Sequence, residues 1–238
     1  MAFRRIILEQ DLKHAVYLVI SLYIFRNRLK YKLLTENKIK GDLMKVIVSA
    51  VKGAGKSTAI KFVLEKKPDV KVISVGNYFE EAYKKLGFKR DEGDKAVDRG
   101  RHKQIQIKAF DLISKEIKKH ENVILDTNLF FTKSEGYFPG LPEFVLKKIE
   151  PDAIVIMEYK PDFILARREK DIKAIGRERS ASLTLEGIEM EQKIQRHYGL
   201  VCSALTGCTV KIIRREEPEK YEFEHNKKNA EEILELFK

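Results

Sequence analysis

Residues 45–58 read KVIVSAVKGAGKST, and this stretch decides the fold. Its first five residues form a largely β-branched run, which predicts a strand buried on both faces of a parallel sheet. Gly53 and Gly55 follow in a turn, and a helix is predicted from Lys56 to about Lys66. The N–H groups of such a turn and the positive end of the helix dipole together suit a bound phosphate.

The turn approaches the G-x-x-x-x-G-K-[ST] spacing of the phosphate loops that bind nucleoside triphosphates. Gly55, Lys56 and Ser57 fit this spacing, but its first position is Ala50 rather than glycine. Because Ala50 lies at the start of the predicted nucleotide-binding loop, its methyl group disturbs binding less than the loss of Gly53 or Gly55 would. We expect Lys56 to reach the β- and γ-phosphates and the Ser57 hydroxyl to ligate Mg²⁺.

Strand-like and helical runs alternate along the rest of the 238 residues. The predicted strands are 45–49, 70–75, 122–126, 153–158 and 208–213, and a final helix capped by Asn226 is predicted through Leu236. Such alternation is typical of the doubly wound α/β architecture. We therefore predict a P-loop fold with a five-stranded parallel sheet, helices on both faces and a ligand site at the carboxyl ends of the strands.

Asp126 ends the predicted strand 122–126, where a magnesium-binding aspartate stands in many phosphate-loop proteins. It is our second predicted metal ligand, although an aspartate at this position is also often a helix cap or a turn residue. The guanine-reading motif N-K-x-D does not occur in the sequence, which argues against a GTPase.

Residues 166–182 read ARREKDIKAIGRERSAS and carry six cations against three acids. The segment follows the fourth predicted strand, so it is expected beside the phosphate loop. A lid at about 169–183 would place arginines around a transferring phosphoryl group, whose charge spreads over three oxygens. A solvated charged loop is the alternative, and the phosphate loop upstream favours the lid.

The composition narrows the class of protein. Apolar residues make up 43% of the chain, enough for a sizeable core, while a charged share of 35% excludes a bulk membrane protein. Lys and Arg number 47 against 36 Asp and Glu, and the formal charge of +11 suits nucleotides, nucleic acid or a membrane surface without choosing among them. Cys202 and Cys208 lack zinc-site spacing and are expected to be buried in a reducing cytosol.

Residues 1–43 differ from the rest and are treated as a separate N-terminal extension. They hold nine Lys/Arg and four Asp/Glu, and their apolar run, 15–25, spans 11 residues, whereas a membrane helix needs roughly 20. Three interpretations remain: a basic amphipathic helix that contacts a membrane or nucleic acid, a helix added to the main domain, or residues outside the working protein. The last is suggested by Met44, which stands directly before the first predicted strand.

Residues 44–236 resemble the archaeal-type adenylate kinases. The resemblance is most specific at GYFPGLP (136–142) with the EFVLKKIEPDAIVIME that follows, at the R-x-R of the arginine-rich segment, and at SALTGCTVKII (203–213). It implies a nucleotide kinase domain at 44–238 that transfers the γ-phosphoryl group of ATP to AMP with Mg²⁺, giving two ADP. It also implies a cytoplasmic homo-oligomer, commonly a trimer.

The resemblance assigns roles to particular residues. It puts the triphosphate on Gly53, Ala54, Gly55, Lys56, Ser57 and Thr58. It makes Arg177 and Arg179 the lid arginines and brings Arg167 or Arg168 near the phosphates; of these two, Arg168 is the predicted catalytic residue. It places adenine against Thr206 and Gly207, and it implies an AMP pocket formed by residues 76–79 and 136–142.

The departures from the family pattern fall mostly on the acceptor side. Asp94 stands where the family tends to have arginine, Asn128 replaces the histidine of D-T-H, and Thr132 replaces a basic residue. These departures leave open a related P-loop kinase with a different acceptor. The charge and the basic extension leave open an ATPase or ATP-binding factor that acts on RNA or the ribosome.

Overall fold

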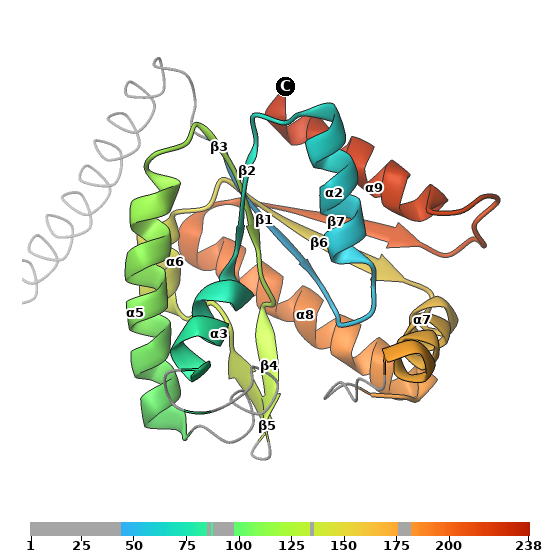
Figure 1. Cartoon of the computed structure of the whole chain (residues 1–238), viewed down its shortest axis with the longest axis horizontal. Coiled ribbons are helices and arrows are strands. Elements are labelled where there is room, and N and C mark those ends of the chain that lie inside the picture. The colour runs from blue at the N-terminus through green and yellow to red at the C-terminus, as the bar shows by residue number, and fades with distance from the viewer. Residues whose placement is uncertain (1–43, 85–86, 88–97, 134–135, 176–181) are drawn as a thin grey trace, which may run out of the picture. The chain divides into compact units, whose positions relative to one another are not determined.

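A five-stranded parallel sheet organises the part of the chain that the computed structural model describes, residues 44–84, 87, 98–133, 136–175 and 182–238. The strands are β1 (Met44–Ala50), β2 (Lys71–Ser74), β3 (Asn122–Asp126), β6 (Ala153–Tyr159) and β7 (Thr209–Arg215). Their order across the sheet is β2-β3-β1-β6-β7, and every neighbouring pair is parallel (Figure 1). The predicted fold class is confirmed.

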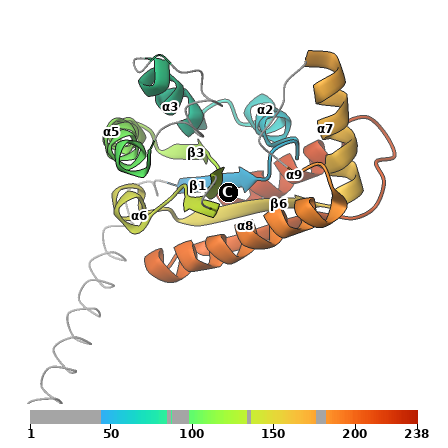
Figure 2. The same cartoon turned by 90° about the horizontal axis from the view of Figure 1, so that it is seen from below.

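Successive residues of a strand point to opposite faces of the sheet, and in these strands the residues on both faces are largely apolar. Helices therefore cover both faces. The helices are α2 (Lys56–Lys66), α3 (Val75–Lys84), α5 (Arg99–Ile117), α6 (Glu143–Ile149), α7 (Pro161–Ile175), α8 (Leu185–Thr206) and α9 (Glu224–Leu234), followed by the 3₁₀ turn η2 (Glu235–Phe237). Ile47 of β1 packs in one core with α5 and α6, and its neighbours Val46 and Val48 pack in the other with α2 and α9. Figure 2 shows α2 on one side of β1 and β6, and α6 and α8 on the other.

A short antiparallel hairpin stands apart from the main sheet. It pairs β4 (Phe130–Lys133) with β5 (Gly136–Pro139) in the register Phe130↔Pro139, whereas the sequence predicted only a loop at 136–142. Runs of four residues are too short for a clear periodic pattern, so the pairing was not visible beforehand. Gly140 directly follows β5 and packs closely against the chain before β4: a Cβ there would lie 2.2 Å from the carbonyl oxygen of Asn128.

The carboxyl ends of the parallel strands lie along one edge of the sheet and their amino ends along the opposite edge, and different segments of the chain surround each. The carboxyl ends of β1 and β3 lead into residues 51–55 and 127–128, and both segments line one pocket. The amino ends of β6 and β7 lie at the opposite edge, where Thr209 N–H donates to the carbonyl of Asp152 at 3.1 Å. A ligand at the carboxyl edge is therefore remote from residues that lead into β7.

Several predicted features lie outside the described residues: the extension 1–43, the lid arginines Arg177 and Arg179, and Asp94. The division into an extension and a kinase domain thus stays a prediction. Within the described ranges, no helix combines the length and the apolar character that crossing a membrane requires.

Candidate active site

The phosphate loop between β1 and α2 depends on two glycines in left-handed conformation. Gly53 has φ 84° and Gly55 has φ 82°, a region that residues with a Cβ avoid. Ala54 N–H donates to the carbonyl of Val51 at 3.2 Å and closes the turn. The carbonyl of Gly55 accepts from Thr58 and Ala59 N–H, each at 3.1 Å, and so begins α2 directly after the loop.

The loop forms one wall of a pocket of about 660 Å³. Lining residues come from the loop and from the segments that follow β2, β3, β6 and β7, all at the carboxyl edge of the sheet. The predicted residues Ala50, Gly53, Ala54, Gly55, Lys56, Ser57, Thr58 and Asp126 are all among them. The structure therefore brings the whole predicted loop and Asp126 together around one space.

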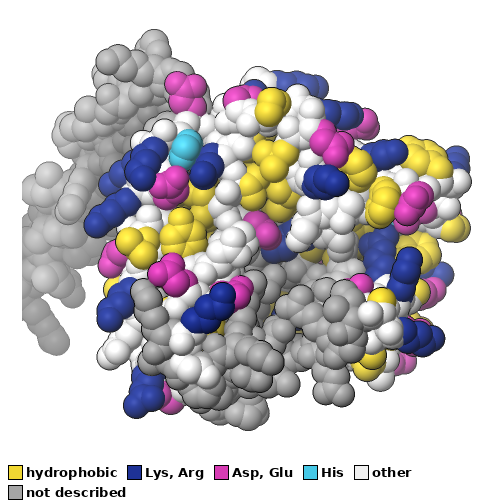
Figure 3. Space-filling view, viewed as in Figure 1, with side chains coloured by type: hydrophobic (Ala, Val, Ile, Leu, Met, Phe, Trp, Pro, Cys, Tyr) yellow, Lys and Arg dark blue, Asp and Glu magenta, His cyan; other side chains and the backbone are white. Residues whose placement is uncertain are grey.

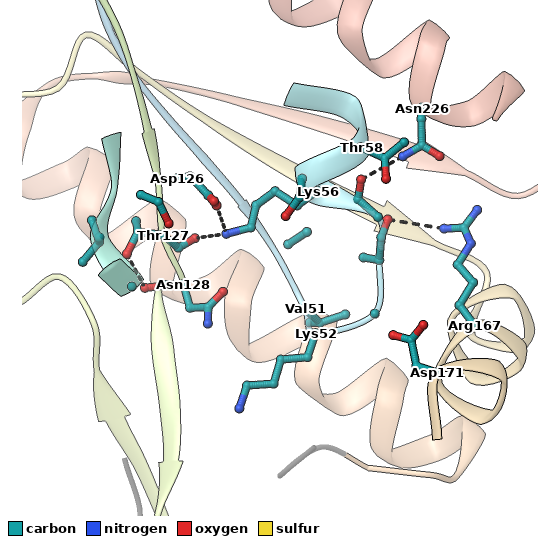
Figure 4. A pocket seen from close by; sticks show the side chains of 18 of the residues that line it. Val51, Lys52, Lys56, Thr58, Asp126, Thr127, Asn128, Arg167, Asp171 and Asn226 are labelled. Atoms are coloured by element: carbon teal, nitrogen blue, oxygen red, sulfur yellow. Dashed lines mark hydrogen bonds and ion pairs between the residues drawn. The ribbon is translucent and has the colours of Figure 1, made fainter. Parts of the chain in front are cut away.

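Lys56 reaches across the pocket to the end of β3 (Figure 4). Its ammonium group forms an ion pair with the Asp126 carboxylate and donates to the carbonyl oxygen of Thr127 at 2.9 Å. The side chains of Lys56 and Asp126 are only 15% and 17% exposed. A partly buried lysine beside the loop N–H groups suits the binding of a phosphate.

The oxygen donors in the pocket suit a hard divalent cation. Ser57 is exposed to the pocket at the start of α2, and Asp126 lines the same space from β3. No group of three or more His, Cys, Asp or Glu side chains able to hold a metal occurs among the described residues. A hydroxyl and one carboxylate fit Mg²⁺ that takes its remaining ligands from nucleotide phosphates and water.

Arg167 and Arg168 are neighbours on α7, but only Arg167 lines the pocket. Its Nη1 donates to the carbonyl of Ala54 at 3.3 Å, as Figure 4 shows, and Nη2 lies 3.6 Å from a Glu219 carboxylate oxygen. The guanidinium carbon lies 4.7 Å from the centre of the Tyr159 ring. Burial raises the pKa of Tyr159 to about 12, so this ring stays neutral beside the cation.

Arg168 points to the other side of α7. Its side chain is 2% exposed, pairs with Glu191 and donates to the carbonyl of Lys52. This placement contradicts the predicted catalytic role of Arg168, because its guanidinium is held behind the loop. Adjacent helical residues lie about 100° apart, so only one of the two arginines faces the pocket.

The C-terminal part of the chain supplies the wall opposite the hairpin. Asn226 on α9 donates from Nδ2 to the carbonyl of Gly55 at 2.8 Å, and Glu219, Glu222 and Phe223 line the pocket beside it. Sequence analysis gave Asn226 only a capping role. The residue at the cap is Phe223, with φ 62°, and Asn226 lies within the first turn of α9.

Residues at the acceptor side come from α3 and from the chain after β3. Gly76, Phe79, Asn128 and Phe131 line the pocket, and the Phe79 and Phe131 ring centres are 6.2 Å apart. The predicted segment 76–79 thus contributes to the wall. Residues 136–142 do not line the pocket, so this half of the predicted AMP site is not brought to it.

Comparisons with known proteins show the family to which the chain belongs. Residues 49–186 match the family model described as an AAA domain. The adenylate kinase of Pyrobaculum aerophilum is 35% identical over 196 residues, which cover 81% of this chain and 96% of that protein. The adenylate kinase of Thermoplasma acidophilum is 35% identical over 176 residues, which cover 73% and 91%. The chain belongs to the archaeal-type adenylate kinase family.

A solved structure from Chloroflexus aurantiacus has a TM-score of 0.52 at 12% identity and covers 84% of this chain and 100% of its own. This likeness shows the fold alone. By its similarity to the adenylate kinases, the chain is a member of the P-loop nucleoside monophosphate kinases. Its pocket lies at the carboxyl ends of the parallel strands, where ligands bind in such folds.

The structure does not bring the predicted adenine-binding residues, Thr206 and Gly207, to this pocket. Thr206 ends α8, and Gly207 is its left-handed C-cap with φ 78°. Both precede β7 and lie at the amino edge of the sheet, where the Thr206 hydroxyl donates to the carbonyl of Cys202 at 2.8 Å. The segment that follows β7, including Glu222 and Phe223, is the part that reaches the pocket.

Proposed function

We propose that the chain transfers the γ-phosphoryl group of MgATP to AMP and forms two ADP. The observation that carries this proposal is a single pocket that runs from the phosphate loop, past Lys56 and Asp126, to Phe79 and Phe131. One continuous pocket allows two nucleotides to meet end to end. The relatives named adenylate kinase support the same reaction.

On the donor side, the proposed phosphate ligands are the N–H groups of residues 53–58 and the ammonium group of Lys56. The triphosphate would replace Asp126 as the partner of Lys56, and Asp126 would then turn to the metal with Ser57. Mg²⁺, when bound, supplies positive charge to the phosphate oxygens. The proposed donor base lies against the wall made by Glu222, Phe223 and Asn226, which replaces the position predicted at Thr206 and Gly207.

The chemistry asks little more of the protein than positioning and charge. An oxygen of the AMP phosphate attacks the γ-phosphorus in line, and the bond from that phosphorus to the departing ADP oxygen breaks as the new bond forms. The attacking oxygen is already ionised, so no general base is required. Lys56 and Arg167 are placed to stabilise the charge that spreads over the γ-phosphoryl oxygens.

Arg177 and Arg179 remain our proposed lid arginines. They belong to the sequence between α7 and α8, and α7 lines the pocket through Arg167, Lys170 and Asp171. A lid at about 169–183 that covers the transferring group would exclude water, which would otherwise accept the phosphoryl group in place of AMP.

The acceptor side is where this chain departs from its family pattern. Asn128 lines the pocket in place of the expected histidine, and the aromatic rings of Phe79 and Phe131 offer an apolar surface for a base. This substitution favours, as a second candidate, a P-loop kinase whose acceptor is a different nucleoside monophosphate.

An acceptor panel tests both candidates. Full-length protein would be assayed with MgATP and AMP, CMP, GMP, UMP or dAMP, with ADP formation followed by a coupled reaction and by chromatography. We expect AMP to give the highest kcat/KM, and the Lys56→Ala variant to serve as the background control. A higher kcat/KM for another acceptor would replace adenylate kinase by the second candidate, and ATP hydrolysis with no acceptor effect would indicate an ATPase.

We further propose a cytoplasmic homo-oligomer, a trimer as in the family, and sedimentation analysis of the full chain tests its mass. The alternative role on RNA or the ribosome gains little from the face of the molecule that Figure 3 shows. On the face in Figure 3, basic and acidic side chains are interspersed rather than gathered by sign. Salt-dependent RNA binding by residues 1–238 but not 44–238 would revive that role for the extension.

A further inference from the structure

Arg168 is buried behind the phosphate loop, where its guanidinium is engaged on three sides. Nε donates to the carbonyl of Lys52 at 2.8 Å, Nη1 to the carbonyl of Ser182 at 2.5 Å, and Nη2 to a Glu191 carboxylate oxygen at 2.7 Å. The other oxygen of Glu191 accepts the N–H of Ser182 at 2.8 Å. One ion pair thus ties the loop to the start of α8.

The bond to Lys52 fixes the orientation of the peptide unit that joins Lys52 to Gly53. The described chain has no cis peptide bond, so the C=O and N–H of this unit point in opposite directions. The carbonyl faces Arg168 on α7, and the N–H of Gly53 therefore faces away from α7. Because Gly53 lines the pocket and Arg168 does not, this N–H is turned toward the side where a phosphate would bind.

Packing reinforces that orientation. A Cβ at Gly53 would lie 2.9 Å from Cγ of Arg168, so the glycine and the arginine side chain are in direct contact. Rotation of the peptide between Lys52 and Gly53 would break its hydrogen bond to Arg168. Glu191 opposes a movement of Arg168, since its side chain is 13% exposed and binds both the guanidinium and Ser182.

We propose that Arg168 is a positioning residue for the phosphate loop and that Glu191 holds it in place. The proposal rests on the proposed function, because it assigns the Gly53 N–H to a nucleotide phosphate. Arg168 acts through the Lys52–Gly53 peptide and touches no phosphate itself. This role replaces the direct phosphate contact that the sequence suggested.

The Glu191→Gln variant separates the two roles because they predict effects of opposite sign. If Arg168 positions the loop, the loss of the carboxylate charge loosens it and weakens nucleotide binding. If Arg168 instead left Glu191 to contact a nucleotide phosphate, the same change would free its guanidinium and strengthen nucleotide binding. We expect the Kd for MgATP to rise about tenfold in Arg168→Ala, the size of one charge-assisted hydrogen bond, and to rise less in Glu191→Gln.

The experiment uses the full chain, calorimetric titration with MgATP and with inorganic triphosphate, and steady-state kinetics with AMP. KM should rise while kcat at saturation changes little, since the loop binds its phosphate in both ground and transition states. Arg196→Ala is the matched control: Arg196 lies on α8 and, like Arg168, pairs with a glutamate, here the buried Glu158, but its side-chain hydrogen bonds go to Glu158 and not to the phosphate loop. The control should lower thermal stability and leave the Kd unchanged.

A fold-preserving variant covers the case in which Arg168→Ala unfolds. Arg168→Met with Glu191→Leu replaces the buried pair by apolar side chains, which proteins often tolerate, yet it still removes the anchor of the Lys52 carbonyl. This variant should be folded and bind MgATP more weakly.

Three results would overturn the proposal: unchanged affinity in the double variant, tighter binding in Glu191→Gln, or a lower kcat at unchanged Kd in Arg168→Ala. A wild-type chain that binds MgATP but phosphorylates no acceptor would instead overturn the proposed activity, and the comparison of Kd values would still stand.

Discussion

The contact between Gly55 and Asn226 predicts a non-additive pair of mutations. Asn226 is 4% exposed and donates to the Gly55 carbonyl at 2.8 Å, and a Cβ at Gly55 would lie 2.8 Å from the same Nδ2 atom. Gly55→Ala therefore does two things: it places a Cβ at φ 82° and it displaces the Asn226 amide.

The expected magnitudes follow from these contacts. A side chain in left-handed conformation costs roughly 1–2 kcal/mol, and the lost hydrogen bond costs about 1 kcal/mol. Gly55→Ala should thus destabilise the fold by about 2–3 kcal/mol and Asn226→Ala by about 1 kcal/mol. In the double variant the hydrogen bond is already lost, so its free energy of unfolding should match that of Gly55→Ala alone.

Thermal unfolding of the four proteins measures this coupling. For a chain of this size, about 1 kcal/mol corresponds to roughly 2–4 °C in Tm. Asn226→Ala should lower Tm by that amount in the wild type and by less than about 1 °C in the Gly55→Ala background. The reasoning fails if Asn226→Ala lowers Tm equally in both backgrounds, because the two residues would then act independently.

Four further predictions concern the proposed chemistry and the extension. Lys56→Ala should remove most phosphoryl transfer, about 100-fold or more in kcat, while the protein remains folded; near-full turnover would contradict its phosphate role. Asp126→Asn should weaken the binding of Mg²⁺-bound ATP more than that of metal-free ATP, as titration with and without a chelator would show, and equal losses would remove Asp126 from the metal site. Arg177→Ala and Arg179→Ala should lower kcat more than nucleotide affinity in steady-state and binding assays, whereas unchanged kcat at saturation would make both arginines ground-state clamps. A chain of residues 44–238 should fold and keep its phosphotransferase activity beside the full chain; aggregation or lost turnover would show that the extension is structural.

The sheet and the phosphate loop were predictable because their signals are local. The β-branched run before Gly53 and the turn glycines predict a strand, a loop and a helix from fourteen consecutive residues, and the structure has these elements as β1 and α2. The same local information gives the edge of the sheet at which Lys56 lies. Asp126 follows from the same rule, since it ends a neighbouring parallel strand.

The sequence did not predict contacts between residues far apart in the chain, nor which side of a helix faces the pocket. Thr206 and Gly207 precede the strand 209–215, so the rule that places ligands at carboxyl ends argues against them, whereas the family resemblance favours them. Which of Arg167 and Arg168 faces the pocket depends on how α7 is oriented about its own axis, and the sequence does not give this orientation. The bond between Asn226 and Gly55 joins residues 171 positions apart, and no local pattern announces such a contact.

That long separation has a consequence for how the protein is made. Synthesis runs from the N-terminus, so the phosphate loop leaves the ribosome long before α9 does. Asn226 emerges 171 residues after Gly55 and binds its carbonyl, and with Glu222 and Phe223 it forms a wall of the pocket. A nascent chain thus carries the complete phosphate-loop sequence without the complete pocket. Since contacts between distant residues form late in folding, the pocket is complete only once α9 has packed against α2.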